Sequence, residues 1–362
     1  MRIRSRCLPI AGVLVLAACG PRVPSVTLAV DRKLNATFGA VSDVVEIAGG
    51  RVAFADPMAR RFHTGDFATG SVDTIGVPVD SLPYNAPPSL YRHPGWVAQL
   101  AGDTVAVVDF GATRTTLWTP AGFARVLTIP EAGGPTPVLV YDTLGHGYKV
   151  DFRSVTGGAE PGVVMRNDSL PVLRMNFATG GVDTIARLSV PEFGEAKFGP
   201  QVQTVAQIFG PADVFGVLPD GTIWVARART LSVDWRAPDG TWTRGAGHSY
   251  AKVTVTEVDR KRVMDRLHAH GMPSNVEVVF PFAKTKPSFE AALGRPGGEV
   301  WLQYSRADEA DPMTYAVVGR DGAMLRTVTV PAGVGITSVS GQYAYGALKA
   351  GNARELVRLA IP

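Results

Sequence analysis

Nine residues of this chain occur twice with a single change. Residues 67–75 read FATGSVDTI, and residues 177–185, 110 positions later, read FATGGVDTI. In each copy the opening residues are suited to end one strand, the Ala-Thr-Gly segment to turn with glycine supplying a positive φ, and Val-Asp-Thr-Ile to begin the returning strand. The repeat therefore predicts a recurring β-hairpin tip and a fold built from copies of one unit.

Weaker copies of the same tip lie at 119–127, 237–244 and 319–328. One glycine then marks each of five tips, namely Gly70, Gly122, Gly180, Gly240 and Gly322. Successive glycines are 52, 58, 60 and 82 residues apart, so the 110-residue repeat spans two units and the last step contains an insertion.

Upstream of most tips, a glycine-containing turn opens into a nearly continuous apolar run. These runs are VAFAD (52–56), VAVVD (105–109), IWVA (223–226) and VWLQY (300–304). Apolarity at consecutive positions indicates a strand that is buried on both faces. Each unit is therefore interpreted as four antiparallel strands with tight first and third turns.

Four-stranded units stacked radially form a β-propeller, which leaves only short, protected edges. We predict an all-β, six-bladed β-propeller; a seven-bladed ring is the alternative. A sixth unit begins at Ile336 and holds only three strands, so Ser25–Val30 is predicted to supply its fourth strand and close the ring. The five complete units are predicted at 43–76, 97–129, 138–188, 213–244 and 287–330.

Residues 55–70, ADPMARRFHTGDFATG, resemble a repeat unit of the NHL type. The chain as a whole is similar to six-bladed propellers of the NHL and TolB-like kind, which include exported bacterial lipoproteins. This resemblance covers nearly all of the chain after its first 18 residues, and it implies a fold rather than an activity. The six-bladed lactonases hold a divalent cation with acidic and asparagine ligands, and we do not find their spaced motifs here.

The first 18 residues have the pattern of an export signal: three arginines, a short apolar run and two alanines. That apolar run is too short to span a bilayer. Leu16-Ala17-Ala18-Cys19 resembles a bacterial lipobox, which implies that Cys19 becomes the lipid-modified N-terminus; an ordinary secretory signal is the alternative. We predict a signal peptide at 1–18, a tether at 19–24 and one propeller domain at 25–362. No aspartate follows Cys19, which by the same resemblance favours the outer membrane.

The charge and cysteine content restrict the partners. The chain has two cysteines, Cys7 and Cys19, so the mature protein is expected to have no disulfide and to depend on its core for stability. Loss of three signal-peptide arginines and no acids lowers the net charge from +4 to +1. This balance gives no support for nucleic-acid binding, and we expect a monomer.

Residues 254–271 depart from the β pattern. Thr256 is suited to cap a helix, Val263 and Leu267 are four residues apart, and Gly271 is suited to end it. We predict one amphipathic helix at about 256–270. Because strands alternate in direction, it is expected on the face that carries the long connections, where binding sites tend to be placed. It is either a packing element under a long loop or a lid or docking element.

Six residues are candidate binding residues on that face: Asp56, Asp109, Arg61, Arg114, Arg227 and Arg229. The two aspartates end the second strand of their units, where a carboxylate can bind a polar ligand or a metal. It can also cap a turn by accepting backbone N–H bonds. Arg227 and Arg229 are suited to line a polar rim or to form salt bridges between units.

The sequence contains no HExxH, CxxC, GxSxG, Walker or dinucleotide-binding motif. We therefore expect no catalytic residue, metal or cofactor. The first hypothesis is a lipid-anchored binding or scaffolding propeller that presents its long connections to an envelope protein, a peptide or a glycan. The alternative is a metal-dependent hydrolase or lyase in which Asp56, Asp109 and a histidine converge. A stability-only role in a larger assembly is the third.

Overall fold

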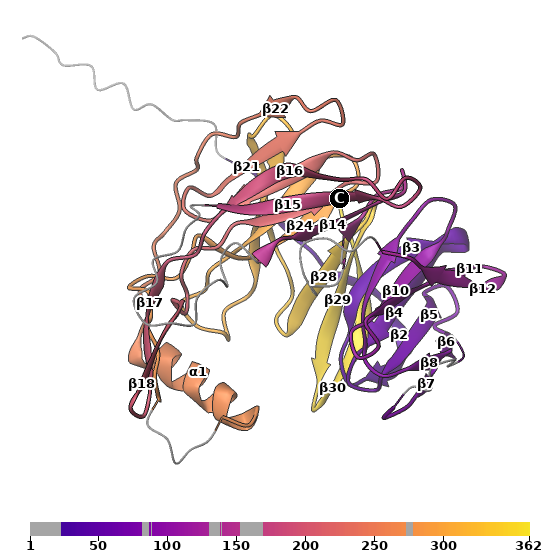
Figure 1. The fold of residues 1–362 in the computed structure, drawn as a ribbon, viewed down its shortest axis with the longest axis horizontal. Coiled ribbons are helices and arrows are strands. Elements are labelled where there is room, and N and C mark those ends of the chain that lie inside the picture. Colours follow the sequence, from indigo (N-terminus) through magenta and orange to yellow (C-terminus); the bar gives the residue numbers. More distant parts are fainter. Residues whose placement is uncertain are drawn as a thin grey trace, which may run out of the picture.

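The computed structural model describes residues 23–81, 87, 89–129, 138, 140–152, 169–272 and 278–362 (Figure 1). Its described strands form six sheets that each contain four consecutive antiparallel neighbours. We number these sheets 1 to 6 in chain order. Over these described ranges the structure is all-β apart from one α-helix and one 3₁₀ turn, Ala48–Gly50.

Sheet 1 contains β3 (Ser42–Ile47), β4 (Arg51–Asp56), β5 (Arg61–Asp66) and β6 (Val72–Ile75), and sheet 2 contains β9 (Pro94–Gln99), β10 (Val105–Asp109), β11 (Arg114–Thr119) and β12 (Gly122–Leu127). Sheet 3 contains β13 (Val140–Tyr141), β14 (His146–Val150), β15 (Ser169–Asn176) and β16 (Val182–Ser189), and sheet 4 contains β19 (Val214–Val217), β20 (Ile223–Arg227), β21 (Ser232–Arg236) and β22 (Trp242–Thr243). Sheet 5 contains β24 (Phe289–Arg295), β25 (Glu299–Tyr304), β26 (Thr314–Gly319) and β27 (Met324–Thr329), and sheet 6 contains β28 (Val334–Val339), β29 (Tyr343–Ala350), β30 (Ala353–Ala360) and β2 (Val30–Phe38).

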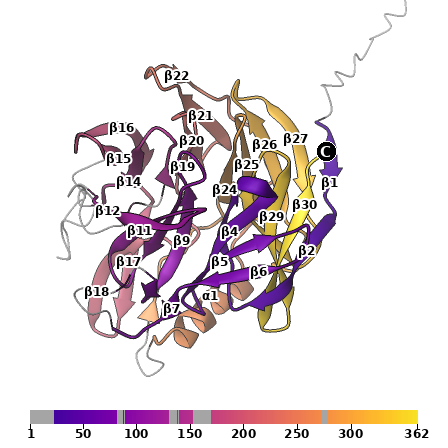
Figure 2. The same cartoon turned by 90° about the vertical axis from the view of Figure 1, so that its right-hand side faces the viewer.

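The first strands of the six sheets form a closed cycle. β3 contacts β9, β9 contacts β13, β13 contacts β19, β19 contacts β24, β24 contacts β28, and β28 returns to β3. These strands are therefore the innermost strands of a ring, and the other three strands of each sheet lie further from its axis (Figures 1 and 2). This radial arrangement of antiparallel sheets is a β-propeller.

Each of six apolar clusters packs between two neighbouring sheets, including sheets 6 and 1. Alternate residues of one strand belong to different clusters, because side chains alternate across a strand. In β10, Val105 and Val107 pack against sheet 1, whereas Ala106 and Val108 pack against sheet 3. This two-sided burial confirms the interpretation of the continuous apolar runs.

The two near-identical nonamers form the same turn. Gly70 has φ 76° and Gly180 has φ 72°, and each donates its N–H to the carbonyl four residues earlier, of Asp66 and Asn176. Gly122, Gly240 and Gly322 also have positive φ. All five predicted tips therefore turn at a glycine in the left-handed region, which L side chains rarely adopt.

The strand that closes the ring differs from the prediction. β2 pairs with β30 in sheet 6, with Val30 opposite Leu359 and Thr37 opposite Glu355, whereas β1 (Ser25–Thr27) pairs in parallel with β27 in sheet 5. The prediction that Ser25–Val30 closes the ring was therefore wrong, because the closing strand is the next strand along the chain, β2. The sequence pattern did not indicate this strand. Only Leu34 and Phe38 of Val30–Phe38 are buried, and the pairing of β2 with β30 is irregular after Val30 and after Lys33.

Two connections between sheets form an accessory unit. The connection from sheet 3 to sheet 4 contributes β17 (Phe193–Phe198) and β18 (Gln201–Ala206), and the connection from sheet 4 to sheet 5 contributes α1 (Glu257–Ala269) and β23 (Val278–Val279). β17 lies between β18 and β23 in a three-stranded sheet. Both views place α1 and β18 at the same end of the molecule (Figures 1 and 2). The helix confirms the prediction at about 256–270. β7 (Val77–Pro78) and β8 (Leu90–Tyr91) form a short parallel pair between sheets 1 and 2.

Candidate functional site

The second-to-third-strand loops and the connections between sheets leave the ring on one side, which we call the long-loop face. Three cavities of the described residues are lined by these segments and by the strand ends beside them. We name them the helix cavity, of about 320 Å³, the rim cavity, of about 600 Å³, and the accessory cavity, of about 480 Å³. Each lies within the size range of small-molecule sites.

Asp56 and Asp109 are buried at the long-loop ends of β4 and β10, with 2% and 0% of their surface exposed. Asp56 accepts N–H bonds from four residues of two turns: Gly39, Ala40, Met58 and Ala59. Asp109 accepts N–H bonds from Arg92, His93 and Ala112. These carboxylates tie the incoming connection to the next turn of the same sheet, so the geometry favours turn capping over ligand binding.

Arg227 occupies the corresponding strand end in sheet 4. Its guanidinium donates to Asp213 at 2.8 Å and to Asp234 at 2.9 Å, and it also reaches the carbonyl of Arg187 in sheet 3. Asp213 in turn accepts the N–H groups of Ser189 and Ala228. In sheet 4, the ion pair of Arg227 and Asp213 therefore links the incoming connection to the end of the second strand, as a single aspartate does in sheets 1 and 2.

The three remaining candidates lie apart from one another. Arg61 begins β5 in sheet 1 and is exposed. Arg114 donates to the carbonyl of Leu90 and lies 4.0 Å from Asp109 in sheet 2. Arg229 pairs with Glu192 at 2.5 Å and lines the accessory cavity. Arg229 is thus the one sequence-predicted binding residue that lines a described cavity. Cys19 lies outside the described residues.

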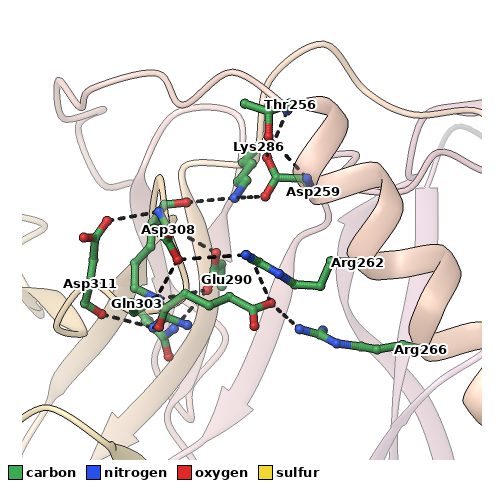
Figure 3. Close-up of polar contacts among 12 residues, drawn as sticks. Thr256, Asp259, Arg262, Arg266, Lys286, Glu290, Gln303, Asp308 and Asp311 are labelled. Atoms are coloured by element: carbon green, nitrogen blue, oxygen red, sulfur yellow. Dashed lines mark hydrogen bonds and ion pairs between the residues drawn. The ribbon is translucent and has the colours of Figure 1, made fainter.

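Helix α1 is held to the long-loop face by polar contacts. Thr256 and Asp259 form a reciprocal capping box at its N-terminus, and Asp259 is the helix's one buried residue. Lys286 Nζ lies 2.7 Å from Asp259 Oδ1 and donates to the carbonyl of Arg306 at 2.9 Å (Figure 3). Burial acts to raise the pKa of Asp259, but hydrogen bonds from Lys286 and Thr256 outweigh it and hold the pKa at about 2.

The opposite wall of the helix cavity is the loop at 305–313, between β25 and β26. Figure 3 shows Arg262 and Arg266 pointing from α1 toward this loop, where both pair with Glu309. Arg306 donates to the carbonyls of Glu309 and Asp311. Arg306 and Glu309 line the helix cavity and the rim cavity alike, so two residues form the shared wall between the two cavities.

Four innermost strands carry a bulge, which places one extra residue opposite its neighbour. The register shifts between Ser42 and Val44 in β3, between Pro94 and Trp96 in β9, between Phe289 and Ala291 in β24, and between Ile336 and Ser338 in β28. The extra residues are Asp43, Gly95, Glu290 and Thr337. Sheets 5, 6, 1 and 2 are consecutive in the ring. Bulges re-aim side chains and are frequent beside binding sites.

Asp43 is the residue of this group with the most unusual environment. It has φ 28°, and its Oδ2 atom is buried without a hydrogen-bond partner in the described part of the chain. Burial raises the pKa of the Asp43 carboxyl well above its ordinary value. The residue as a whole is half-buried, but a carboxyl with one buried, unpartnered oxygen and a positive φ is costly to keep, and such groups concentrate at functional sites. Sequence reasoning missed Asp43 because a lone Asp in SDVVEI carries no motif.

Replacement of Asp43 by asparagine is expected to stabilise the protein above neutral pH. A folded-state pKa above the unfolded one means that the folded carboxyl holds its proton more tightly, so stability falls as the pH rises from about 4 through the folded-state pKa. Asparagine has no such titration, and it tolerates the positive φ. Urea denaturation at about pH 4 and pH 8 should show the gain at pH 8 alone. An equal gain at both values would mean that ionisation is not its cause.

The described residues contain no group of three or more His, Cys, Asp or Glu side chains placed to hold a metal ion. No helix in the described ranges has the length and apolarity needed to cross a membrane. The metal site of the alternative hypothesis, built from Asp56, Asp109 and a histidine, therefore has no assembled ligand set among these residues.

Comparison with known proteins supports the fold. No protein-family model matches this chain, and no curated protein matches it. Solved structures that match include a DUF4221 family member from Bacteroides vulgatus, with 9% identity over 92% of this chain and 98% of that one, and a TM-score of 0.51. A Bacteroides fragilis protein whose name suggests export has 10% identity over 94% and 100%, also with a TM-score of 0.51. A Xanthomonas campestris gluconolactonase has 13% identity over 95% and 98%, with a TM-score of 0.43.

The DUF4221 family member, which has a TM-score of 0.51, is a β-propeller-like protein. At these identities the likeness concerns the fold alone, which agrees with the closed cycle of innermost strands.

Proposed function

We propose that this chain is a lipid-anchored, six-bladed propeller of the cell envelope that binds its ligand through the long-loop face. The observation that carries this proposal is the location of the three described cavities, which are all lined by that face. The accessory unit, which includes α1, is built on the same face, whereas the turns on the opposite face are short. A rigid ring with elaborated loops on one side is typical of proteins that bind through those loops.

The sequence features at the N-terminus support the cellular location. Residues 1–18 are the proposed export signal, and Cys19 is the proposed attachment point of the lipid. We propose that the outer membrane holds the anchor, and that an envelope protein, a peptide or a glycan is the ligand of a monomeric propeller. The small net charge expected of the mature chain argues against nucleic acid as a partner.

The lipid anchor at Cys19 and ligand binding at the long-loop face can be tested in the same strain. The full chain should fractionate with membranes, and a Cys19→Ser variant should be recovered in the soluble fraction. A photo-crosslinking amino acid at Lys252, which lines the accessory cavity, should capture a ligand. The same group at Asp239, in the short turn between β21 and β22, should not. Equal capture from both positions, or membrane association of the Cys19→Ser variant, would contradict the proposal.

A hydrolase or lyase on the same ring is the second proposal, and Asp43 is the observation that favours it. A carboxyl whose pKa is raised by burial is suited to donate a proton to a leaving group. Metal analysis of purified protein, with a panel of lactones and esters, tests this. Turnover that Asp43→Asn abolishes, while leaving the protein folded, would support it. Absence of turnover across the panel, with or without a divalent ion, would count against it.

A further inference from the structure

The rim cavity lies between sheets 5 and 6 on the long-loop face. Its walls come from the loop at 305–313, the connection at 330–333, and the ends of β28, β29 and β30. Its lining includes the apolar residues Met313, Pro331 and Ile336 and the basic residues Lys349 and Arg354. The cavity thus combines apolar and basic lining groups.

Lys349 and Arg354 stand directly opposite each other in the β29–β30 pair. Like charges at opposite positions of an antiparallel pair are destabilising. Within the described residues, no carboxylate lies in ion-pair distance of either side chain, and Arg354 donates only to the carbonyl of Ala353. Other cations of the same sheet are paired: Lys33 with Glu355, and Arg358 with Asp31.

A third cation of this cavity also has spare hydrogen-bonding capacity. The Arg306 Nη1 atom is used by two backbone carbonyls. Its Nε atom is buried without a hydrogen bond and lies 3.9 Å from Glu290. The two acids that line the cavity are engaged elsewhere, since Glu309 pairs with the arginines of α1 and Asp311 accepts the N–H of Asp308.

We propose that the rim cavity binds a small organic anion. Its carboxylate or phosphate group is held by Lys349 and Arg354, with Arg306 as a further donor, and its body lies against Met313, Pro331 and Ile336. A bound oxyanion relieves the repulsion between the two opposed cations, which makes their juxtaposition favourable in the complex. The cavity volume of about 600 Å³ accommodates a ligand of one or two sugar rings and excludes a long polymer from full burial.

This inference rests on the proposed use of the long-loop face and names the ligand chemistry at one place on it. Titrations of the full-length protein with glucuronate, glucose 6-phosphate and glucose, followed by calorimetry, test it. Both anionic sugars, or one of them, should bind, and glucose should bind at least about tenfold more weakly because it lacks the charge-assisted contacts. The stronger of the two anions identifies the preferred group. Failure of both anions to bind, or equal binding of glucose, would overturn the proposal.

Matched variants locate the binding. Lys349→Gln with Arg354→Gln should weaken binding of the preferred anion by about tenfold or more. Lys33→Gln with Arg358→Gln, which removes the same charge from the same sheet, should leave it unchanged. Equal loss in both double variants would show a net-charge effect and reject the cavity. Arg306→Gln is a separate check that leaves the strands intact, and no change in affinity there would remove Arg306 from the site. Crosslinking of a ligand at Lys252 does not depend on anion binding in the rim cavity. Failure of the titrations would therefore reject the rim-cavity proposal and leave the proposed function to be tested by crosslinking.

Discussion

Replacement of Lys286 by methionine is expected to destabilise the protein by about 3–5 kcal/mol, because removal of one partner of a buried ion pair leaves the other charge uncompensated. Lys286 and Asp259 are 6% and 4% exposed, and their atoms are 2.7 Å apart. The remaining contacts of Asp259, with Thr256, do not neutralise its charge. Chemical denaturation near pH 7 measures the loss.

A double-mutant cycle separates the pair from its surroundings. Asp259→Asn keeps an oxygen for the capping box and removes the charge, so the double variant Lys286→Met with Asp259→Asn should lose clearly less stability than the sum of the two single variants. The Asp259 pKa of about 2 sets the pH range. Stability supplied by the pair should be complete above the unfolded-state pKa near 4 and should be lost as the pH falls toward 2. Additive effects, with no dependence on acid pH, would contradict the role of the pair.

Truncation of Leu34 to alanine is the second large effect, with an expected loss of about 2–5 kcal/mol. Leu34 lies in the closing strand β2, is 1% exposed and packs in the cluster between sheets 6 and 1 with Val44, Phe54 and Leu356. Gly65 leaves room for it, since a Cβ at Gly65 would stand 2.5 Å from Leu34 Cδ1. The cavity left by truncation therefore falls at the junction that completes the ring.

Val30 provides the matched control. It belongs to the same strand but is 40% exposed, so Val30→Ala should change stability by less than about 0.5 kcal/mol. Thermal or urea denaturation of both variants measures the difference. If Leu34→Ala cost no more than Val30→Ala, β2 would contribute little to the closed ring.

The sequence patterns predict the ring because its repeats carry strong local signals. Glycines at hairpin tips must adopt positive φ, and the second strands are apolar at consecutive positions because each packs against two sheets. The closing strand lacked such a signal. Leu34 and Phe38 are separated by Asn35, Ala36 and Thr37, and the bulged pairing with β30 removes the regular alternation that marks a strand.

The candidate site was less predictable than the fold. Aspartates at strand ends were compatible with ligand binding or with turn capping, and Asp56 and Asp109 accept backbone N–H groups, as the turn-capping alternative predicts. Conversely, Asp43 depends on a bulge, and the Lys349–Arg354 juxtaposition depends on the register of two strands. Helix α1 could be predicted from its N-terminal cap, but the ion pair of its Arg266 with Glu309, 43 residues later, could be found only in the three-dimensional structure.

Ring closure is most directly tested by a disulfide between Thr37 and Glu355. Directly opposed residues of antiparallel strands have Cα atoms about 4.5–5.5 Å apart, which suits a disulfide. In a full-length chain with serine at positions 7 and 19, Thr37→Cys with Glu355→Cys should form an intrachain disulfide that peptide mass spectrometry detects. The control Thr27→Cys with Glu355→Cys should not, because Thr27 pairs with Thr329 in sheet 5. Crosslinking of the control pair, or failure of the Thr37 pair under the same oxidation, would contradict a ring closed by β2.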